Sequence, residues 1–267
     1  MSDPLFAVKG QVVLVSGGSR GIGRAIAEGF AARGAQVVIG GREQATLEKT
    51  AAEISSDKGP PVRPLVCDVA QPGDIQRIVD QVLSDYQRID TLINVAGVNR
   101  RKPALEITEQ DYDFIMDINL KGAFFLSQAV GRHMVQRGKG SQINIVSLNT
   151  DRPIKNVSPY AMSKSGMGHM TRALALEWGE HGVRVNGIAP GFLLTDLTEK
   201  LWSDPTMQDW GIRNTPQKRL GKPADMVGTA IFLASPASEF MTGQIVYVDG
   251  GFTAGWNWPI PEDGGMD

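Results

Sequence analysis

Short runs of β-branched and other apolar residues recur along the chain, and segments of helical periodicity separate them. In residues 75–86, apolar side chains return every three or four positions, which predicts a helix that packs one face on a sheet. Pro72 and Asp74 precede this stripe and are typical of a helix start. Strands that alternate with helices in this way predict βαβ units and a parallel sheet with helices on both faces. The predicted strands are residues 12–15, 37–39, 65–66, 91–93, 143–146, 183–186 and 245–248.

The length and the charge of the chain limit what it can be. A chain of 267 residues can form one large α/β domain, and no linker or repeat divides it, so we expect a single domain over residues 1–267. The formal net charge of -2 provides no overall basic field for a nucleic acid backbone. No apolar run approaches a membrane span, and the first residues do not resemble a signal peptide. We therefore expect a cytoplasmic protein that binds neither nucleic acid nor membrane.

Cysteine and histidine are too few and too scattered to suggest a metal site. Cys67 is the only cysteine, which excludes an internal disulfide and a cysteine-rich metal centre. The histidines at 133, 169 and 181 lack ligand spacing. We expect no bound metal.

A glycine-rich turn follows the first predicted strand and leads into a helical pattern. Glycines at 17, 21 and 23 allow the backbone to turn sharply and to approach a pyrophosphate, which then lies at the positive end of the helix. Turns collect glycine for other reasons, but the order of strand, turn and helix is the one that a dinucleotide site requires. The residues predicted to contact the cofactor here are Gly17, Ser19, Arg20, Gly21, Ile22 and Gly23.

The end of the second predicted strand favours NADP(H) over NAD. Gly40, Gly41 and Arg42 stand where an NAD site commonly has a carboxylate for the ribose hydroxyls. Arg42 can pair with a 2′-phosphate, and Arg20 can approach it from the glycine turn. The alternative for both arginines is a solvated surface position.

A tyrosine and a lysine four residues apart suggest proton transfer. Tyr160 and Lys164 share one face if this segment is helical, and Ser147 follows the fifth predicted strand. A nearby cation favours the phenolate, so we expect Lys164 to lower the pKa of Tyr160 and make it a usable acid or base. Taken alone, such a pair is more often an exposed helix face.

The ordered set of motifs resembles the short-chain dehydrogenase/reductase family over about residues 8–252. The resemblance implies one Rossmann-type domain with a seven-stranded parallel sheet, assembled as a homotetramer. It also implies that Tyr160 is the acid/base, that Lys164 lowers its pKa and holds the nicotinamide ribose, and that Ser147 polarises the substrate oxygen. The motifs are Gly17-x-x-x-Gly21-x-Gly23, Asn94-Val95-Ala96-Gly97, Asn119, Ser147, Tyr160-x-x-x-Lys164 and Pro190-Gly191.

Further roles come only from this resemblance. Asn119 matches the family asparagine that supports a proton relay from the lysine, and its alternative role is to bond backbone within a helix. Val95 departs from the family's second asparagine, which removes an amide that is expected to be structural. The resemblance implies cofactor contacts at Asp68, Val69, Asn94, Ala96, Gly97, Tyr160, Lys164, Pro190, Gly191 and Thr195.

Three consecutive cations follow the fourth predicted strand, where loops reach the active-site edge of a parallel sheet. Arg100 and Arg101, with Lys102, suit a substrate carboxylate. Asn149, Asp151 and Arg152 offer hydrogen bonds for hydroxyl groups. The combination resembles the branch of the family that acts on sugar acids, such as gluconate 5-dehydrogenase and 2-deoxygluconate 3-dehydrogenase. The alternative is that the cations are solvated or form salt bridges between subunits.

Two late segments are rich in tryptophan. Residues of about 191–216, with Trp202 and Trp210, are expected to form a mobile lid over the substrate. The tail, residues 253–267, contains two more tryptophans beyond the last strand, and we expect it to contact another subunit.

Two other functions remain open from the sequence. A 3-oxoacyl-carrier-protein reductase has a similar pattern, but it needs a basic surface for its acidic carrier, for which Arg132, Arg137 and Lys139 are the candidates. A catalytically silent NADP(H)-binding scaffold subunit is the second alternative. It has no physical need for Asn119, Ser147, Tyr160 and Lys164 together.

Overall fold

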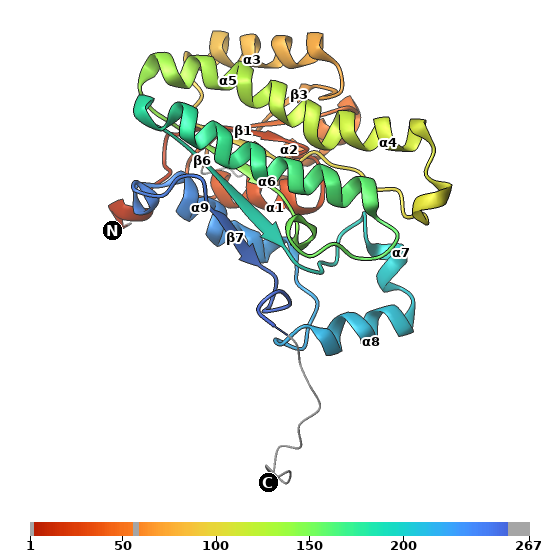
Figure 1. Ribbon diagram of the computed structural model, residues 1–267. Coiled ribbons are helices and arrows are strands. Elements are labelled where there is room, and N and C mark those ends of the chain that lie inside the picture. The colour runs from red at the N-terminus through yellow and green to blue at the C-terminus, as the bar shows by residue number, and fades with distance from the viewer. Residues whose placement is uncertain (1–2, 56–58, 256–267) are drawn as a thin grey trace.

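Seven strands form one parallel sheet in the order β3-β2-β1-β4-β5-β6-β7 (Figure 1). The computed structural model describes residues 3–55 and 59–255. The sheet confirms the predicted α/β fold with seven parallel strands. The strands are β1 Val12–Ser16, β2 Gln36–Gly41, β3 Arg63–Val66, β4 Thr91–Asn94, β5 Gly140–Ile145, β6 Val183–Pro190 and β7 Ile245–Val248.

Helices cover both faces of the sheet, as predicted (Figure 1). Apolar side chains of α1, α2 and α9 pack in one core cluster, and those of α3, α5 and α6 pack in a second cluster on the other face. The strands contribute to both clusters because alternate side chains point to opposite faces. The helices are α1 Gly21–Ala31, α2 Gln44–Ile54, α3 Pro72–Tyr86, α4 Glu109–Met116, α5 Ala123–Arg137, α6 Ser158–Trp178, α7 Glu199–Trp202, α8 Pro205–Asn214 and α9 Val227–Ala234.

The predicted elements have the right type, and their ends differ by a few residues. Helix α3 starts at Pro72, as its start signals indicate. Strand β6 continues four residues beyond the predicted end, to Pro190, because it pairs with β5 on one side and β7 on the other. Val146 was predicted in a strand and lies just beyond β5.

The strand order places a cleft at the carboxyl ends of the central strands β1 and β4. Successive connections run outward in one direction from β1 to β3 and in the other direction from β4 to β7. The loops that follow β1 and β4 therefore diverge, and a parallel sheet binds its ligand at this point, beyond the carboxyl ends of the strands. Both the glycine-rich turn and the three consecutive cations lie in these two loops.

No helix in the described part of the chain is both long and apolar enough to cross a bilayer. The predicted subunit contact of the tail falls almost wholly outside the described residues, which end at Gly255.

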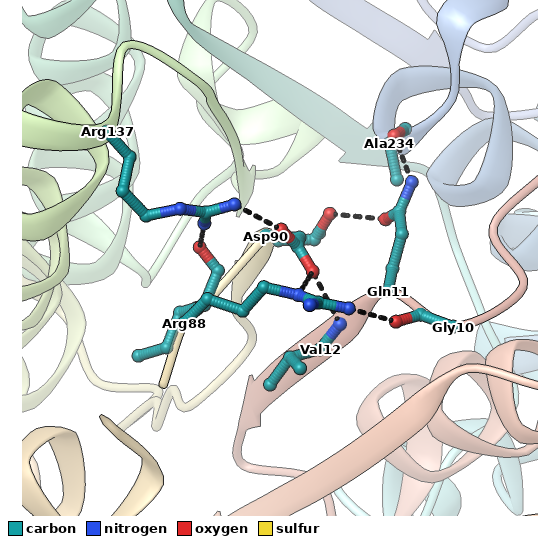
Figure 2. Close-up of polar contacts among 9 residues, drawn as sticks. Gly10, Gln11, Val12, Arg88, Asp90, Arg137 and Ala234 are labelled. Carbon is teal, nitrogen blue, oxygen red and sulfur yellow. Dashed lines mark hydrogen bonds and ion pairs between the residues drawn. The ribbon is translucent and has the colours of Figure 1, made fainter. Parts of the chain in front are cut away.

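At the amino-terminal ends of the strands, opposite the cleft, the chain is held by a hydrogen-bond network around Asp90 (Figure 2). The carboxylate of Asp90 accepts hydrogen bonds from the backbone N–H of Val12 at 2.9 Å, Arg88 Nε at 2.9 Å and Arg137 Nη2 at 3.0 Å. These donors come from the start of β1, the turn before β4 and the end of α5. Burial raises the pKa of Asp90, but the three donors outweigh it and hold the pKa below its usual value.

Asp90→Asn is expected to destabilise the protein by about 1–3 kcal/mol at pH 7, because the amide cannot replace the charge between two guanidinium groups. The pKa of Asp90 is lower in the folded chain than in the unfolded chain. Its contribution is therefore complete above the ordinary carboxyl pKa and disappears as the pH falls through the folded value. Urea unfolding at pH 7 and at pH 3 measures this, and the difference between variant and wild type should shrink at pH 3. Asp80→Asn, on the exposed face of α3, is the matched control; an equal effect there would contradict the prediction.

Candidate active site

Close backbone packing requires glycine in the turn after β1. Gly17 has a φ of +76°, and a Cβ on it would lie 2.7 Å from the backbone nitrogen of Ala96. A Cβ on Gly23 would lie 2.1 Å from the carbonyl oxygen of Gly17. The turn is therefore held tightly against the loop after β4 and against the first turn of α1, and no other residue type fits at either position.

The N-terminus of α1 offers free backbone donors to the cleft. Arg20 is the N-cap residue, and its side chain makes no capping hydrogen bond. The first N–H groups of α1 therefore keep their hydrogen-bonding capacity beside the glycine turn. A helix start of this kind fits the pyrophosphate of a dinucleotide, as the sequence predicts.

The cleft continues from the glycine turn past the end of β2. Arg42 is exposed at the cleft wall, as a residue that recognises a 2′-phosphate must be. Glu43 also lines the cleft, and the sequence did not single it out. Its carboxylate accepts a hydrogen bond from Thr46 Oγ1 at 3.0 Å. The predicted contacts that line the cleft are Gly17, Ser19, Arg20, Gly21, Ile22, Arg42, Asp68, Val69, Ala96, Gly97 and Thr195.

The loop after β3 forms the next part of the wall. Asp68 receives its orientation from Asp74, whose Oδ2 accepts a hydrogen bond from the Asp68 backbone N–H at 2.9 Å. Cys67 also lines the cleft, but burial raises the pKa of its thiol to about 12, so it is not a nucleophile at neutral pH.

The side chain of Asn94, a predicted cofactor contact, points into the protein. Its Nδ2 donates to Ser127 Oγ and to Asn144 Oδ1, both at 2.9 Å. Asn144 Nδ2 donates in turn to Thr171 Oγ1 at 2.9 Å. This buried network joins β4 and β5 to α5 and α6, so the Asn94 side chain ties the two strands to the helices that cover them.

Asn119 lies in a π-helical turn, Asp117–Gly122, between α4 and α5. Its side chain is fully buried, accepts from the backbone N–H of Val98 at 2.8 Å and donates to Val98 O at 2.9 Å. It also donates to Ser163 Oγ at 3.1 Å. Asn119 thus bonds backbone, although in the loop after β4 and not in its own helix. Turns of this type recur at functional sites.

Lys164 is a buried cation at the same place. Its Nζ donates to the carbonyl oxygen of Ile145 at 2.7 Å, and burial lowers its pKa to about 8. A Cβ on Gly97 would lie 3.6 Å from Lys164 Nζ and 3.5 Å from Asn119 Oδ1. The structure therefore brings Asn119 and Lys164 together around Gly97.

Ser147 lies two residues beyond β5, and Asn149 fixes its position. Ser147 Oγ accepts from the backbone N–H of Asn149 at 3.1 Å and from Asn149 Nδ2 at 3.3 Å. Asn149 Oδ1 accepts from the backbone N–H of Ile154 at 3.1 Å. Asn149 was predicted to bind substrate hydroxyls. In the structure its amide bonds Ser147 Oγ and the backbone of Ile154, which orients Ser147; a contact with substrate stays a prediction.

The pKa of Tyr160 differs in direction from the sequence-based expectation. Partial burial raises it, and the Ser147 hydroxyl and the charge of Arg101 offset part of this rise. Lys164 Nζ donates to the carbonyl of Ile145 and lies 5.8 Å from the centre of the Tyr160 ring. Burial is thus the largest effect on this pKa, and a lowering by Lys164 stays a prediction.

The three consecutive cations are not equivalent. Arg100 bonds Asp111 Oδ1 and lies over the Phe114 ring, 4.6 Å from its centre. Lys102 Nζ donates to Asp111 Oδ2 at 2.6 Å. Arg101 makes no ion pair within residues 3–55 and 59–255, and its charge acts on Tyr160. Arg100 is therefore held by a carboxylate of its own chain, and its contact with a substrate stays a prediction. Arg152, another predicted substrate residue, is also exposed.

The segment after β6 is anchored by aromatic rings. Phe192 packs edge to face against Trp202 and Trp210 at 5.4 Å and against Phe252 at 4.6 Å. Trp202 is buried, and its Nε1 donates to Leu193 O at 2.9 Å. The predicted lid thus contains α7 and α8 and is packed on the end of the sheet.

The predicted contacts at 190–195 divide between two hollows. Thr195 lies in the cleft beside Gly21. Gly191 lines a neighbouring hollow near Asp249, beside β7, and Pro190 ends β6.

Across the described ranges 3–55 and 59–255, no cluster of three or more His, Cys, Asp or Glu side chains could hold a metal ion.

Known proteins resemble this chain over almost its whole length. The family model described as enoyl-(acyl carrier protein) reductase matches residues 7–253. Gluconate 5-dehydrogenase of Gluconobacter oxydans is 39% identical over 254 residues, 95% of this chain and 99% of the relative. The 5-keto-D-gluconate 5-reductase of Escherichia coli is 36% identical over 94% of this chain and 98% of its own. The crystal structure of a gluconate 5-dehydrogenase from Burkholderia cenocepacia, in complex with NADP and tartrate, superposes with a TM-score of 0.90 at 36% identity, over 94% and 98% of the two chains. The chain belongs to the short-chain dehydrogenase/reductase family of oxidoreductases.

Proposed function

We propose that this protein is an NADP(H)-dependent oxidoreductase that interconverts a secondary alcohol and a ketone on a sugar acid. The observation that carries the proposal is Arg101, an exposed cation in the loop after β4 that has no ion pair in the described chain and whose charge lowers the pKa of Tyr160. A guanidinium at this place can hold a substrate carboxylate while the tyrosine reaches the reacting oxygen. The relatives named for gluconate and its 5-keto form, and the tartrate of the Burkholderia complex, support a polyhydroxy carboxylate as substrate.

The proposed cofactor fits the cleft at each end. The glycine turn and the free N–H groups of α1 suit a pyrophosphate, and Arg42 suits a 2′-phosphate. When bound, NADP(H) supplies or accepts the hydride. The protein's own contribution is to orient the substrate and to stabilise charge.

Ser147 and Tyr160 are proposed to hold the reacting oxygen. Because the pKa of Tyr160 is raised, its hydroxyl is protonated at neutral pH, which is the form that donates a proton in ketone reduction. Lys164, four residues along the same helix with a pKa of about 8, can resupply that proton, and Asn119 fixes the neighbouring loop. Alcohol oxidation needs the deprotonated tyrosine, so it is favoured at higher pH.

The acyl-carrier alternative is not favoured. Among the candidate cations for docking an acyl carrier, Arg137 bonds Asp90 and Lys139 precedes β5. Both therefore lie at the amino-terminal ends of the strands, on the side of the sheet away from the active site. Arg132 is bonded to Gln128 of its own helix. The silent scaffold is disfavoured because Asn119, Ser147, Tyr160 and Lys164 are all present and converge.

A steady-state assay of the purified enzyme tests the proposal. NADPH oxidation with 5-keto-D-gluconate, neutral keto sugars and an acetoacetyl thioester, and NADP⁺ reduction with aldonates and polyols, would give kcat/KM for each. The keto acid and the aldonate should be preferred. Preference for the thioester, or cofactor binding without turnover on the whole panel, would refute the assignment.

Arg42→Ala is expected to lower kcat/KM with NADPH by about tenfold or more and to change the value with NADH little, because one charge-assisted pairing to the 2′-phosphate is lost. The ratio of the two kcat/KM values measures the change. Arg33→Ala, beyond the far end of α1, is the matched control. An unchanged ratio would show that Arg42 does not recognise the phosphate.

The homotetramer is part of the same proposal. Phe125, Met162 and Leu176 on α5 and α6 are exposed, and an assembly would cover them. Light scattering of the purified protein gives the number of subunits. Closure of residues 191–216 over the substrate and a cytoplasmic location also stay predictions.

A further inference from the structure

We propose that Asp111 is a positioning residue for substrate recognition: it binds the cations on both sides of Arg101 and thereby directs Arg101 toward the substrate carboxylate. The inference rests on the proposed function, because it requires a substrate with a carboxylate. Asp111 itself is expected to touch neither substrate nor cofactor.

Asp111 is built into the start of α4. Its backbone N–H donates to Thr108 Oγ1 at 3.1 Å, and its Oδ2 accepts from the Thr108 backbone N–H at 3.3 Å, which forms a capping box. The residue is 1% exposed although it carries a charge. A buried carboxylate requires partners, and Lys102 and Arg100 supply them, so the pKa of Asp111 is held well below its usual value.

The two ion pairs determine where Arg101 points. Arg100 and Lys102 converge on one carboxylate, so their side chains lie on the same side of the loop. Pro103 favours extended backbone at Lys102, and side chains alternate along extended backbone, so we expect Arg101 to point to the other side of the loop. The effect of the Arg101 charge on Tyr160 agrees with this direction.

The loop is also fixed at its far end. The backbone N–H of Lys102 donates to Asn156 O at 3.0 Å, in the segment between Ser147 and Tyr160. Arg100 is held from a second side by the Phe114 ring. The loop that presents Arg101 is thus fixed to α4 by side chains and to the catalytic segment by backbone. Ordering it before the substrate binds lowers the entropy cost of binding.

A double-mutant cycle tests the proposal. Asp111→Asn, Arg101→Gln and the double variant are compared with 5-keto-D-gluconate and with the neutral ketone 5-keto-D-fructose at saturating NADPH. Asparagine keeps an oxygen for the capping box and removes the charge. For the keto acid, Asp111→Asn should raise KM by about tenfold with kcat nearly unchanged, since a charge-assisted contact loses its geometry. For the neutral ketone, KM should stay within about twofold.

The cycle separates a positioning role from a general structural one. If Asp111 acts through Arg101, the double variant should have the same KM as Arg101→Gln alone. Additive losses, or equal losses on acid and neutral substrates, would overturn the proposal. Asp113→Asn, exposed on the same helix, is the matched control and should be unchanged.

The remaining outcomes are also decisive. A wild-type enzyme that prefers the neutral ketone would refute the proposed function, and this inference with it. A wild-type preference for the acid that Arg101→Gln leaves intact would refute the inference alone. If Asp111→Asn does not fold, Arg100→Met removes one of the two ion pairs and leaves the capping box. It should raise KM for the keto acid by a smaller factor, and no change in KM would count against the proposal.

Discussion

Tyr160→Phe is expected to lower kcat by about 10²- to 10⁴-fold, because it removes the hydroxyl that transfers the proton to the substrate oxygen and leaves the ring in place. The affinity for NADPH should change little, since the glycine turn and the start of α1 form the phosphate end of the cleft. Single-turnover NADPH oxidation and a fluorescence titration of NADPH measure the two effects separately.

The control for this variant is Tyr112→Phe, which removes a hydroxyl from an exposed tyrosine on α4. It should keep wild-type kcat and NADPH affinity. Turnover of Tyr160→Phe within a few-fold of wild type would show that another group transfers the proton. An equal loss of NADPH affinity would show that the variant damages the cleft and does not test the chemistry.

The fold could be predicted because its signals are local and repeated. Each strand is a short apolar run between turn residues, and the stripe on α3 has one strongly apolar face. The ends of strands were less accurate. Strand β6 extends to Pro190 because its neighbours supply hydrogen-bonding partners on both sides, and the sequence of β6 alone does not contain that information.

The candidate site residues could be named from the sequence, but their hydrogen-bonding partners could not. A motif identifies Lys164, yet only the folded chain shows that its ammonium bonds the carbonyl of Ile145. The three consecutive cations are alike in the sequence, whereas in the structure Asp111 binds two of them. Asp111 had a readable signal, because Thr108-x-x-Asp111 is a capping-box pattern. The ion pairs of its carboxylate depend on where α4 packs, which the pattern does not show.

Gly23→Ala is the second change with a large expected effect. The added methyl group would lie 2.1 Å from the carbonyl oxygen of Gly17, and both are held by backbone, so the turn must open. Such overpacking is expected to cost about 1–3 kcal/mol of unfolding free energy and to weaken NADPH binding by about tenfold to a hundredfold. Binding should suffer because the free N–H groups at the start of α1 move away from the pyrophosphate.

Gly228→Ala provides the comparison, since a Cβ there meets no atom within 4 Å on helix α9. Alanine is the better helix former, so this variant should be as stable as wild type or up to about 1 kcal/mol more stable, with unchanged NADPH affinity. Urea unfolding and NADPH titration of both variants decide the outcome. If Gly23→Ala bound NADPH as tightly as Gly228→Ala, the close contact between Gly23 and Gly17 would not be needed to form the phosphate site.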